Sequence, residues 1–292
     1  MAMEAVPRIT RAQKMDTLSS MANIAGYRAV IEAFNHFPRY SKGVSTAAGK
    51  LAPASVFVIG VGVAGLAAIG TAKGLGAIVK AYDTRKPAQE QAASLGAEVV
   101  TVEYVEEGGG IGGYAKEMSE GYKQAQAAMF ARELPQVDII ITTALIPGKP
   151  APKLVTAEVV RAMQPGSVIV DLAAENGGNC ELTVKNEAVL HQDSGVTLIG
   201  YTDLPSRMAQ QSSQLYSTNV YNLIQELCGA HVQRSNTAAN FHLDLYDEIV
   251  TEIAVAYKGE NRFVPYEEKM RRAQAKPAAP APAPEYKSKE QE

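Results

Sequence analysis

A glycine motif and one acidic residue are the clearest candidates for chemistry in this sequence of 292 residues. The motif GVGVAG spans residues 60–65, follows a strand-like run at Val56–Ile59 and opens a helix of small residues. Gly60 would make a tight turn, Gly62 would let a pyrophosphate approach the backbone, and Gly65 would let helix and strand pack closely. The free N–H groups and positive dipole end of that helix favour phosphate binding.

Asp83 ends the next strand-like run, Ala77–Tyr82, 18 residues after Gly65. A carboxylate at this place accepts hydrogen bonds from the adenosine ribose and repels a 2′-phosphate, which favours NAD over NADP. Arg85 lies close enough to complicate this preference. The alternative is that Asp83 is only a turn residue at a strand end and that the glycines make only a tight connection. Agreement of motif, strand, helix and acid favours a dinucleotide site.

Other residue types indicate no second kind of active centre. Cys180 and Cys228 are isolated, which gives neither a disulfide framework nor a zinc spacing, and the four histidines are scattered. We find no Ser/His/Asp set and no paired catalytic carboxylates, and we expect no metal. A net charge of −3 argues against a nucleic-acid partner.

Short apolar runs alternate with helical stretches on both sides of the glycine motif. The apolar runs are Val56–Ile59, Ala77–Tyr82, Glu98–Val102, Asp138–Thr142, Ser167–Leu172 and Thr197–Gly200. The helical stretches between them are Ala64–Leu75, Pro87–Leu95, Tyr114–Leu134 and Thr156–Met163. This alternation predicts an α/β fold, a Rossmann-type doubly wound parallel sheet with helices on both faces.

The flanking segments have patterns of their own. Asp16–Phe37 is helical, with Asp16 placed to cap it, and Pro38–Pro53 indicates a loop or hairpin. Ser206–Leu227 is a second long helix, and Phe241–Tyr266 suggests a few strands with acidic turns. The Ala-Pro tail at Lys276–Glu292 is expected to be extended or disordered.

Six stretches of the sequence resemble stretches of a known family and follow one another in the same order. The resemblance runs from about Val6 to Val264. These stretches resemble the NAD(H)-binding component (alpha subunit) of proton-translocating NAD(P) transhydrogenases, with alanine dehydrogenases as the nearest related family. The six are Arg8–Asp16, Leu18–Tyr27, Gly112–Met118, Thr142–Pro152, Gly166–Cys180 and Gly200–Arg207.

The resemblance implies a role for each of several positions. The nicotinamide end of the nucleotide would be contacted by Arg8, Gln13, Asp16 and Ser19, with Gln13 beside the hydride-transfer site. The pyrophosphate turn corresponds to Gly60, Gly62, Val63 and Gly65, and the adenosine-side contacts to Asp83, Thr84 and Arg85. A mobile loop that folds over bound nucleotide corresponds to Gly113, Tyr114 and Ala115. Further pocket residues are Gln126, Ala144 and Leu145.

Simpler explanations stay open for some of these positions. Asp16 could only cap its helix. Tyr114 could be a surface tyrosine in a glycine-rich segment, and Ala144 and Leu145 could be strand-end packing.

Within this resemblance we divide the chain into four regions. Residues 1–37 form a nucleotide-contacting loop and linking helix, and residues 38–205 form the Rossmann NAD(H)-binding domain. Residues 206–266 form a return helix and the C-terminal portion of a second lobe, and residues 267–292 form a disordered linker and tail. Long connecting helices and remnants of a second lobe therefore accompany the sheet.

The implied function is hydride transfer from NADH to NADP⁺ held on a partner domain, coupled to proton translocation. Such transfer needs position and exclusion of water rather than an acid or base. Gln13 and Arg8 would orient the dihydronicotinamide, Asp16 belongs to the same catalytic group, and Tyr114 would close the site. NAD(H) is the expected cofactor, with NADP(H) on the partner.

The expected partners are the membrane and NADP(H)-binding components, and a second copy of the chain embraced by the Pro38–Pro53 segment. The expected location is the soluble face of an energy-transducing membrane, bacterial cytoplasm at the inner membrane or mitochondrial matrix, with no transmembrane segment in this chain. The family's first lobe is expected to be missing. Two alternatives follow: a non-catalytic accessory subunit that retains a nucleotide fold, or an alanine dehydrogenase-like enzyme. The second is disfavoured because the substrate lysine and histidine belong to the missing lobe.

Overall fold

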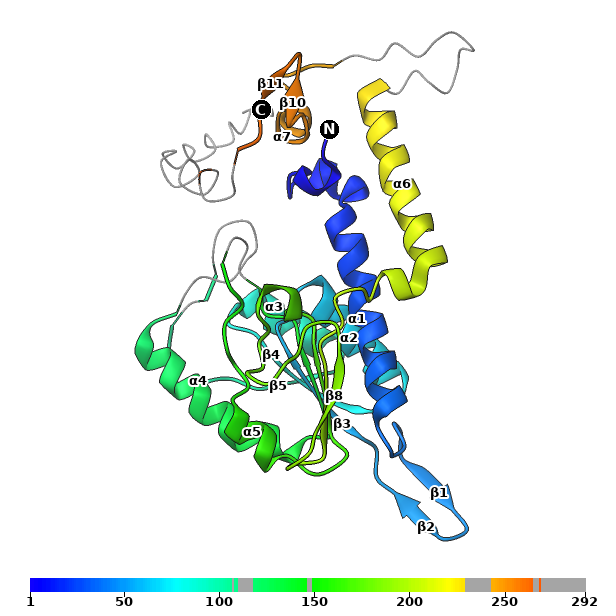
Figure 1. The fold of residues 1–292 in the computed structure, drawn as a ribbon, viewed down its shortest axis with the longest axis vertical. Helices are drawn as coiled ribbons and strands as arrows, with labels where there is room; N and C mark the ends of the chain where they lie inside the picture. Colours follow the sequence, from blue (N-terminus) through cyan, green and yellow to red (C-terminus); the bar gives the residue numbers. More distant parts are fainter. Residues whose placement is uncertain (107, 110–117, 146–148, 229–242, 265–267, 269–292) are drawn as a thin grey trace, which may run out of the picture.

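The computed structural model describes residues 1–106, 108–109, 118–145, 149–228, 243–264 and 268. The predicted loop residues Gly113, Tyr114 and Ala115 lie outside the described residues. Figure 1 shows a region built around a sheet, from which the helices α1 (Thr17–His36) and α6 (Ala209–Cys228) extend side by side to a smaller cluster at the other end. The N-terminus lies in that smaller cluster.

Seven strands form the main sheet in the order β5-β4-β3-β6-β7-β9-β8. They are β3 (Ser55–Ile59), β4 (Ile78–Tyr82), β5 (Glu98–Val99), β6 (Ile139–Thr142), β7 (Val168–Asp171), β8 (Ala188–His191) and β9 (Val196–Ile199). All neighbours pair in parallel except β8, which runs antiparallel to β9 at the sheet edge. The chain moves from β3 out to β5 and then returns to β6 on the other side of β3. The predicted doubly wound parallel sheet is thus confirmed.

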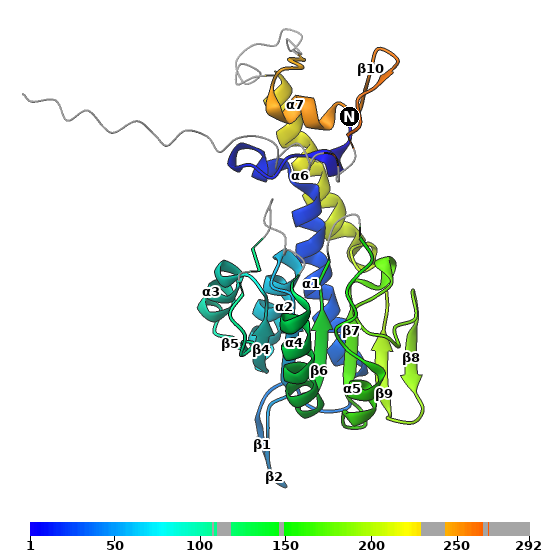
Figure 2. The same ribbon diagram turned by 90° about the vertical axis from the view of Figure 1, so that its left-hand side faces the viewer.

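Helices cover both faces of the sheet, as Figure 2 shows. The other helices are α2 (Val63–Gly74), α3 (Lys86–Ser94), α4 (Glu120–Glu133), α5 (Ala157–Ala162) and α7 (Glu248–Ile253). The short 3-10 helices are η1 (Met3–Ala5), η2 (Thr10–Met15), η4 (Leu134–Gln136), η5 (Ala174–Asn176) and η6 (Ser206–Met208). In the described residues no helix is both long and apolar enough to cross a bilayer.

Side chains alternate between two buried cores because successive strand residues point to opposite faces. Val56 and Val58 of β3 join the core under α1, α2 and α3. Phe57 and Ile59 of the same strand join the core under α4 and α5. Both cores hold β3 rigidly, so the turn that follows β3 starts from a fixed point.

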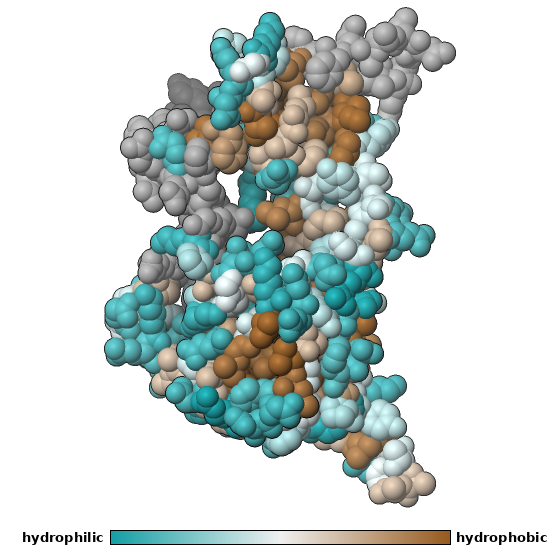
Figure 3. Space-filling view, in the orientation of Figure 1, coloured by the Kyte–Doolittle hydropathy of each residue, from teal (hydrophilic) through white to brown (hydrophobic). Residues whose placement is uncertain are grey.

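A third, separate core lies at the far end of α1 and α6. It combines side chains from distant segments of the sequence: Ala12, Met15, Leu223, Leu227, Ile249, Val250, Ile253 and Ala254. The N-terminal segment therefore packs on α6 and α7 and not on the sheet. Figure 3 shows apolar side chains gathered at this end, over α6 and α7.

Two short hairpins complete the described chain. One joins β1 (Val44–Thr46) to β2 (Gly49–Leu51) and projects away from the sheet (Figure 1). It agrees with the loop or hairpin expected at Pro38–Pro53. The other joins β10 (Ala256–Tyr257) to β11 (Glu260–Asn261) beside α7.

The expectation of a few strands in Phe241–Tyr266 is correct only for its later portion. Helix α7 lies before that portion, because Asp247 caps the helix by accepting hydrogen bonds from the N–H groups of Ile249 and Val250. Ile249, Val250 and Ile253 follow helical spacing and are buried. Only the short β10–β11 hairpin has strand character among the described residues of that stretch.

Two boundaries and one additional strand also differ from the sequence expectation. Helix α4 begins at Glu120 rather than at Tyr114, since Ser119 caps it by accepting from the N–H of Tyr122. Strand β5 is shorter than Glu98–Val102. Strand β8 was not expected, because its alternately exposed residues on the sheet edge give only a weak apolar signal.

Candidate functional site

The glycine turn lies where the order of the sheet reverses, between the carboxyl ends of β3 and β6. This is the place where open α/β sheets bind ligands. Gly60 has φ +92 and its N–H donates to the carbonyl oxygen of Tyr82 at 2.9 Å. A Cβ on Gly65 would lie 2.0 Å from the carbonyl oxygen of Gly60, so only glycine lets α2 start this close to the turn.

Gly62 differs from these two glycines because neither its backbone conformation nor its neighbours in the fold require a glycine at this position. A Cβ added there would meet nothing within 4 Å, and its φ of −85 suits any residue. Gly62 is the N-cap of α2, and no side chain caps this helix. The space before Val63 at the helix start is therefore open to an anion, and the dipole end favours negative charge. This arrangement fits a pyrophosphate.

Asp83, at the end of β4, is only 5% exposed and is bound on both oxygens. Oδ2 accepts from the N–H of Val61 at 2.7 Å and from Nη2 of Arg85 at 2.7 Å. Oδ1 accepts from the backbone N–H and from Nε of Arg85 at 2.8 and 2.9 Å. These four bonds use the lone-pair positions of a carboxylate. A ribose hydroxyl that binds Asp83 must therefore replace one of these four donors.

The side chain of Arg85 also reaches the glycine turn, since Nη2 lies 3.3 Å from the carbonyl oxygen of Val61. Its hydrogen bonds to Asp83 raise the pKa of Arg85 although burial opposes this. Thr84 lies between the two ion-pair partners in sequence. Its Oγ1 is buried and has no hydrogen-bond partner among the described residues.

The end of β6 forms the other wall of the turn. Oγ1 of Thr143 donates to the carbonyl oxygen of Gly60 at 2.8 Å, and a Cβ on Gly60 would lie 3.2 Å from the nitrogen of Ala144. Leu145 is 39% exposed beside it. The structure thus brings the predicted residues Ala144 and Leu145 to the carboxyl end of β6, next to the glycine turn.

Gln126 lies on α4 and is held by a pair of tyrosines. Its Nε2 donates to the phenol oxygen of Tyr82 at 2.8 Å, and that oxygen lies 2.7 Å from the phenol oxygen of Tyr122. Burial raises the pKa of Tyr82, and its hydrogen bond with Tyr122 raises it further, so the phenol stays protonated. Gln126 is thus tied to the residue that precedes Asp83.

The other predicted end of the site is an open cavity of about 370 Å³ in the N-terminal segment. Among the described residues, its lining consists of Pro7, Arg8, Ile9, Gln13, Asp16 and Ser19. Four of them are the residues expected to contact nicotinamide. The surface is hollowed between this segment and the sheet-containing region (Figure 3).

Asp16 has the simpler role that its sequence position indicated. Its Oδ1 accepts from the N–H of Ser19 at 2.9 Å and its Oδ2 from Oγ of Ser19 at 2.6 Å, which caps α1. Because the cavity lies at this helix start, the same two residues both fix the segment and line the cavity. A cap does not prevent contact with a ligand.

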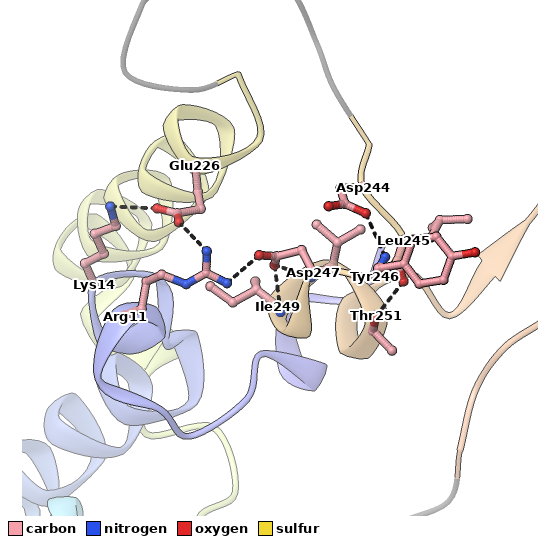
Figure 4. A network of polar contacts seen from close by, with 10 residues as sticks. Arg11, Lys14, Glu226, Asp244, Leu245, Tyr246, Asp247, Ile249 and Thr251 are labelled. Carbon is pink, nitrogen blue, oxygen red and sulfur yellow. Dashed lines mark hydrogen bonds and ion pairs between the residues drawn. The ribbon is translucent and has the colours of Figure 1, made fainter.

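Ion pairs with α6 and with the N-cap residue of α7, together with the third core, hold η2 in place. Arg11 reaches Glu226 at 3.2 Å and Asp247 at 2.5 Å, and Lys14 reaches Glu226 at 3.0 Å (Figure 4). Ala12 and Met15 are fully buried in the third core. This leaves Gln13 to line the cavity.

Helix α1 connects the cavity with the glycine turn. A Cβ on Gly26 would lie 2.0 Å from the carbonyl oxygen of Ala64, so α1 crosses directly over the start of α2. The seven residue steps from Ser19 to Gly26 correspond to a rise of ~10 Å along the helix axis, at 1.5 Å per residue. The cavity and the glycine turn thus lie beside two points of the same helix.

Sequence reasoning missed residues that hold these walls in place. Asn179 binds the backbone of Ala144, and Asp171 binds the loop that carries Asn179. The run Asn176–Asn179, with two adjacent glycines inside one of the six family-like stretches, was the available signal. Among the described residues no group of three His, Cys, Asp or Glu side chains could hold a metal ion.

The sheet order and the glycine turn at its reversal point define the class of this protein: a doubly wound α/β protein of the Rossmann type. The chain belongs to the family described as alanine dehydrogenase/PNT, C-terminal domain, whose model matches residues 29–262.

Individual relatives agree with this family and confirm the resemblance inferred from the sequence. The chain is 53% identical to NAD(P) transhydrogenase subunit alpha of Haemophilus influenzae, over 89% of this chain and 49% of that protein. It is also 53% identical to NAD(P) transhydrogenase subunit alpha of Cereibacter sphaeroides, over 90% of this chain and 50% of that protein. The crystal structure of a transhydrogenase from Sinorhizobium meliloti superposes with a TM-score of 0.76 at 43% identity, over 89% of this chain and 67% of that chain. The chain spans about half the length of these two curated relatives.

Proposed function

We propose that this chain is the NAD(H)-binding component of a proton-translocating NAD(P) transhydrogenase. The observation that carries the proposal is the placement of two complementary sites along α1. An open glycine turn with a buried acid lies at the sheet reversal, and a cavity lined by Arg8, Gln13, Asp16 and Ser19 lies ~10 Å along the helix. The relatives that carry the transhydrogenase name support it.

At each end of the proposed nucleotide site, the residues suit one portion of the nucleotide. Gly62 and the N–H groups at the start of α2 bind the pyrophosphate, because the helix end is open and uncapped. Asp83 binds the adenosine ribose after Arg85 gives up one of its bonds. Thr84, Ala144 and Leu145 complete the wall around the turn.

At the cavity, Arg8 and Gln13 orient the nicotinamide ring, while Asp16 and Ser19 hold the helix start. When bound, NADH supplies the hydride that passes to NADP⁺ on a partner domain. The chain's own residues add position and exclusion of water, with Tyr114 as the residue proposed to close the site.

The partners belong to the same proposal. The membrane and NADP(H)-binding components of a transhydrogenase meet this chain at the soluble face of an energy-transducing membrane. The exposed β1–β2 hairpin embraces a second copy of the chain, and a monomeric mass in solution at micromolar concentration would contradict that dimer. We propose the fourfold division at residues 37, 205 and 266 as the working domain map.

The first experiment titrates the purified chain with NADH and with NADPH, following nicotinamide fluorescence. We expect saturable NADH binding that exceeds NADPH binding and weakens in Asp83→Ala. The matched control is Asp138→Ala. Asp138 also accepts from a backbone N–H, that of Ser55, and from an arginine, Arg39, but it precedes β6 at the amino ends of the parallel strands, away from the glycine turn.

If neither nucleotide binds, a catalytic role is excluded and an accessory subunit remains. If Asp138→Ala weakens NADH as much as Asp83→Ala does, the effect is one of folding and not of the site. When NADH binds as expected, adding the NADP(H)-binding and membrane components should give transfer from NADH to NADP⁺.

A further inference from the structure

Asn179 is a fully buried polar residue that the proposed mechanism does not use. It has no exposed surface and lies in the loop between β7 and β8. Its Oδ1 accepts from the N–H of Ala144 at 3.0 Å, and its Nδ2 donates to the carbonyl oxygen of Ala144 at 2.9 Å. Nδ2 also donates to the carbonyl oxygen of Pro152 at 2.9 Å. The amide therefore pairs with both backbone groups of Ala144, as a neighbouring strand would.

The orientation of this amide is fixed by its partners. Two carbonyl oxygens face Nδ2 and one N–H faces Oδ1, so a reversed amide would place oxygen against two oxygens. An asparagine satisfies all three groups, and an aspartate or a leucine of similar size does not. This specific demand on the side chain indicates more than filling of space.

The loop that carries Asn179 is itself anchored to the sheet. Asp171, 1% exposed, accepts on Oδ2 from the N–H of Cys180 at 3.0 Å and from Oγ1 of Thr183 at 2.7 Å. The carbonyl oxygen of Asn179 accepts from the N–H groups of Leu154 and Val155. Asn179 is thus a rigid support and not a mobile loop residue.

What Asn179 supports is one wall of the glycine turn. Ala144 follows Thr143, whose hydroxyl donates to the carbonyl oxygen of Gly60, and Ala144 itself packs against Gly60. The contacts run from Asn179 to Ala144 and from there to the turn that binds the pyrophosphate.

We propose that Asn179 is a positioning residue for nucleotide binding: it fixes the backbone after β6 so that the cleft beside Gly60 has the shape that the dinucleotide needs. This inference rests on the proposed function, because it assigns a support to the same site. Asn179 does not touch the nucleotide, and it acts through Ala144.

The variant Asn179→Asp tests this through pH. The new carboxyl group would face the carbonyl oxygens of Ala144 and Pro152, and burial would raise its pKa. The charged groups near it are Asp171, which opposes ionisation, and Lys153, whose Nζ donates to the carbonyl oxygens of Gly177 and Cys180 and favours it. One oxygen of the protonated form can accept from the N–H of Ala144 while its O–H donates to the carbonyl oxygen of Ala144, with the bond to Pro152 lost. The ionised form keeps the bond from the N–H but has no donor, so its negative charge faces both carbonyl oxygens.

We expect Asn179→Asp to bind NADH about tenfold more weakly than wild type near pH 8 and to approach wild type near pH 5.5, read within minutes of mixing. Loss of packing alone would not produce such recovery on acidification. The matched control is Thr183→Val, which removes a bond to Asp171 in the same loop and leaves the three bonds of Asn179 intact. It should bind NADH as wild type does.

Equal NADH affinity of Asn179→Asp and wild type at both pH values would overturn the inference, and so would equal weakening by Thr183→Val. If Asn179→Asp does not fold near pH 8, Asn179→Ser replaces it and should bind more weakly at every pH; unchanged binding would again overturn the inference. A wild-type chain that binds no NADH would instead overturn the proposed function, and the inference with it.

Discussion

The two ends of the proposed cleft are held by different kinds of interaction. The glycine turn lies between the two cores of the sheet, and its polar contacts, such as that of Asp83 with Val61, are buried. The cavity in the N-terminal segment rests on a small separate core and on ion pairs at the surface, where the Arg11 side chain is 47% exposed. The glycine turn is therefore built into the sheet-containing fold, whereas the cavity lies in a segment that is attached to that fold from outside.

This difference affects how each end should respond to change. A buried polar contact that loses its partner costs about 1–3 kcal/mol, whereas exposed ion pairs are weak and are screened by salt. The turn should therefore be rigid and pre-formed, while the cavity can open and close at little cost. A cleft with one fixed and one adjustable end can hold a nucleotide and still release it.

The largest expected effect is that of Gly65→Ala, at the fixed end. The added Cβ would lie 2.0 Å from the carbonyl oxygen of Gly60, a backbone atom that cannot yield without moving β3 or α2. We expect a loss of roughly 3 kcal/mol in the free energy of unfolding. Denaturant unfolding measures it, and a stability equal to that of wild type would show that the fixed end is not rigid.

Gly62→Ala separates binding from folding at the same turn. Its Cβ meets nothing within 4 Å of protein, so stability should fall by at most about 1 kcal/mol, the cost of alanine at a helix N-cap. The methyl group enters the space proposed for the pyrophosphate, and NADH affinity should fall about a hundredfold. A fluorescence titration on the folded variant measures this. Unchanged affinity would mean that nucleotide does not approach Gly62.

Gln13→Ala tests the adjustable end alone. Gln13 lines the cavity, and its neighbours Ala12 and Met15 carry the packing, so the fold should not change. We expect NADH to bind about tenfold more weakly, while ADP-ribose, which lacks nicotinamide, binds as it does to wild type. Calorimetric titration with both ligands compares the two ends. Equal weakening of both ligands would contradict the assignment of the ends.

The smallest expected effect is that of acid on the attachment of the N-terminal segment. Burial opposes ionisation of Asp247, but hydrogen bonds from Arg11 and from the N–H groups of Val250 and Ile249 outweigh it, so the pKa of Asp247 is lowered. A carboxylate whose pKa is lowered by folding stabilises the fold at pH values above its pKa in the unfolded chain, which is about 3.9. This stabilisation is lost as the pH falls through the pKa of the carboxylate in the folded protein.

Hydrogen exchange between pH 7 and pH 3 should therefore show loosening of the segment at residues 8–19 before any change at residues 55–60. About 1 M salt, with a screening length of ~3 Å, should loosen the same segment at neutral pH. Asp247→Asn should remove some of the acid response. Simultaneous loosening of both regions would mean that the third core is not separate from the sheet.

Local patterns were enough to predict most of the sheet and one end of the site. The strands β3, β4, β6, β7 and β9 were expected within a residue or two, since buried parallel strands give continuous apolar runs. The glycine turn was expected because its backbone demands are local. Strand β8 and helix α7 were missed, because a half-exposed edge and a six-residue helix give short, weak patterns.

The candidate site shows the same division. The positions of Gly60, Gly62 and Asp83 followed from spacing along one strand–helix–strand unit. The closed pair of Asp83 with Arg85 did not, since it depends on which side-chain donors lie nearest in space. The support of Ala144 by Asn179 was also hidden, because 35 residues separate the two partners.

The order of strands and helices, the glycine turn and the acid that follows β4 are all encoded in short stretches of the amino-acid sequence. Periodicity, capping residues and glycine conformation act within a few residues of each other, so they can be read in one chain without its fold. The place of the N-terminal segment depends instead on the folded molecule, since Arg11 pairs with Asp247 across 236 positions and Met15 is buried by α6 and α7. Such contacts depend on how distant elements pack together, and no local pattern records which partners they will meet.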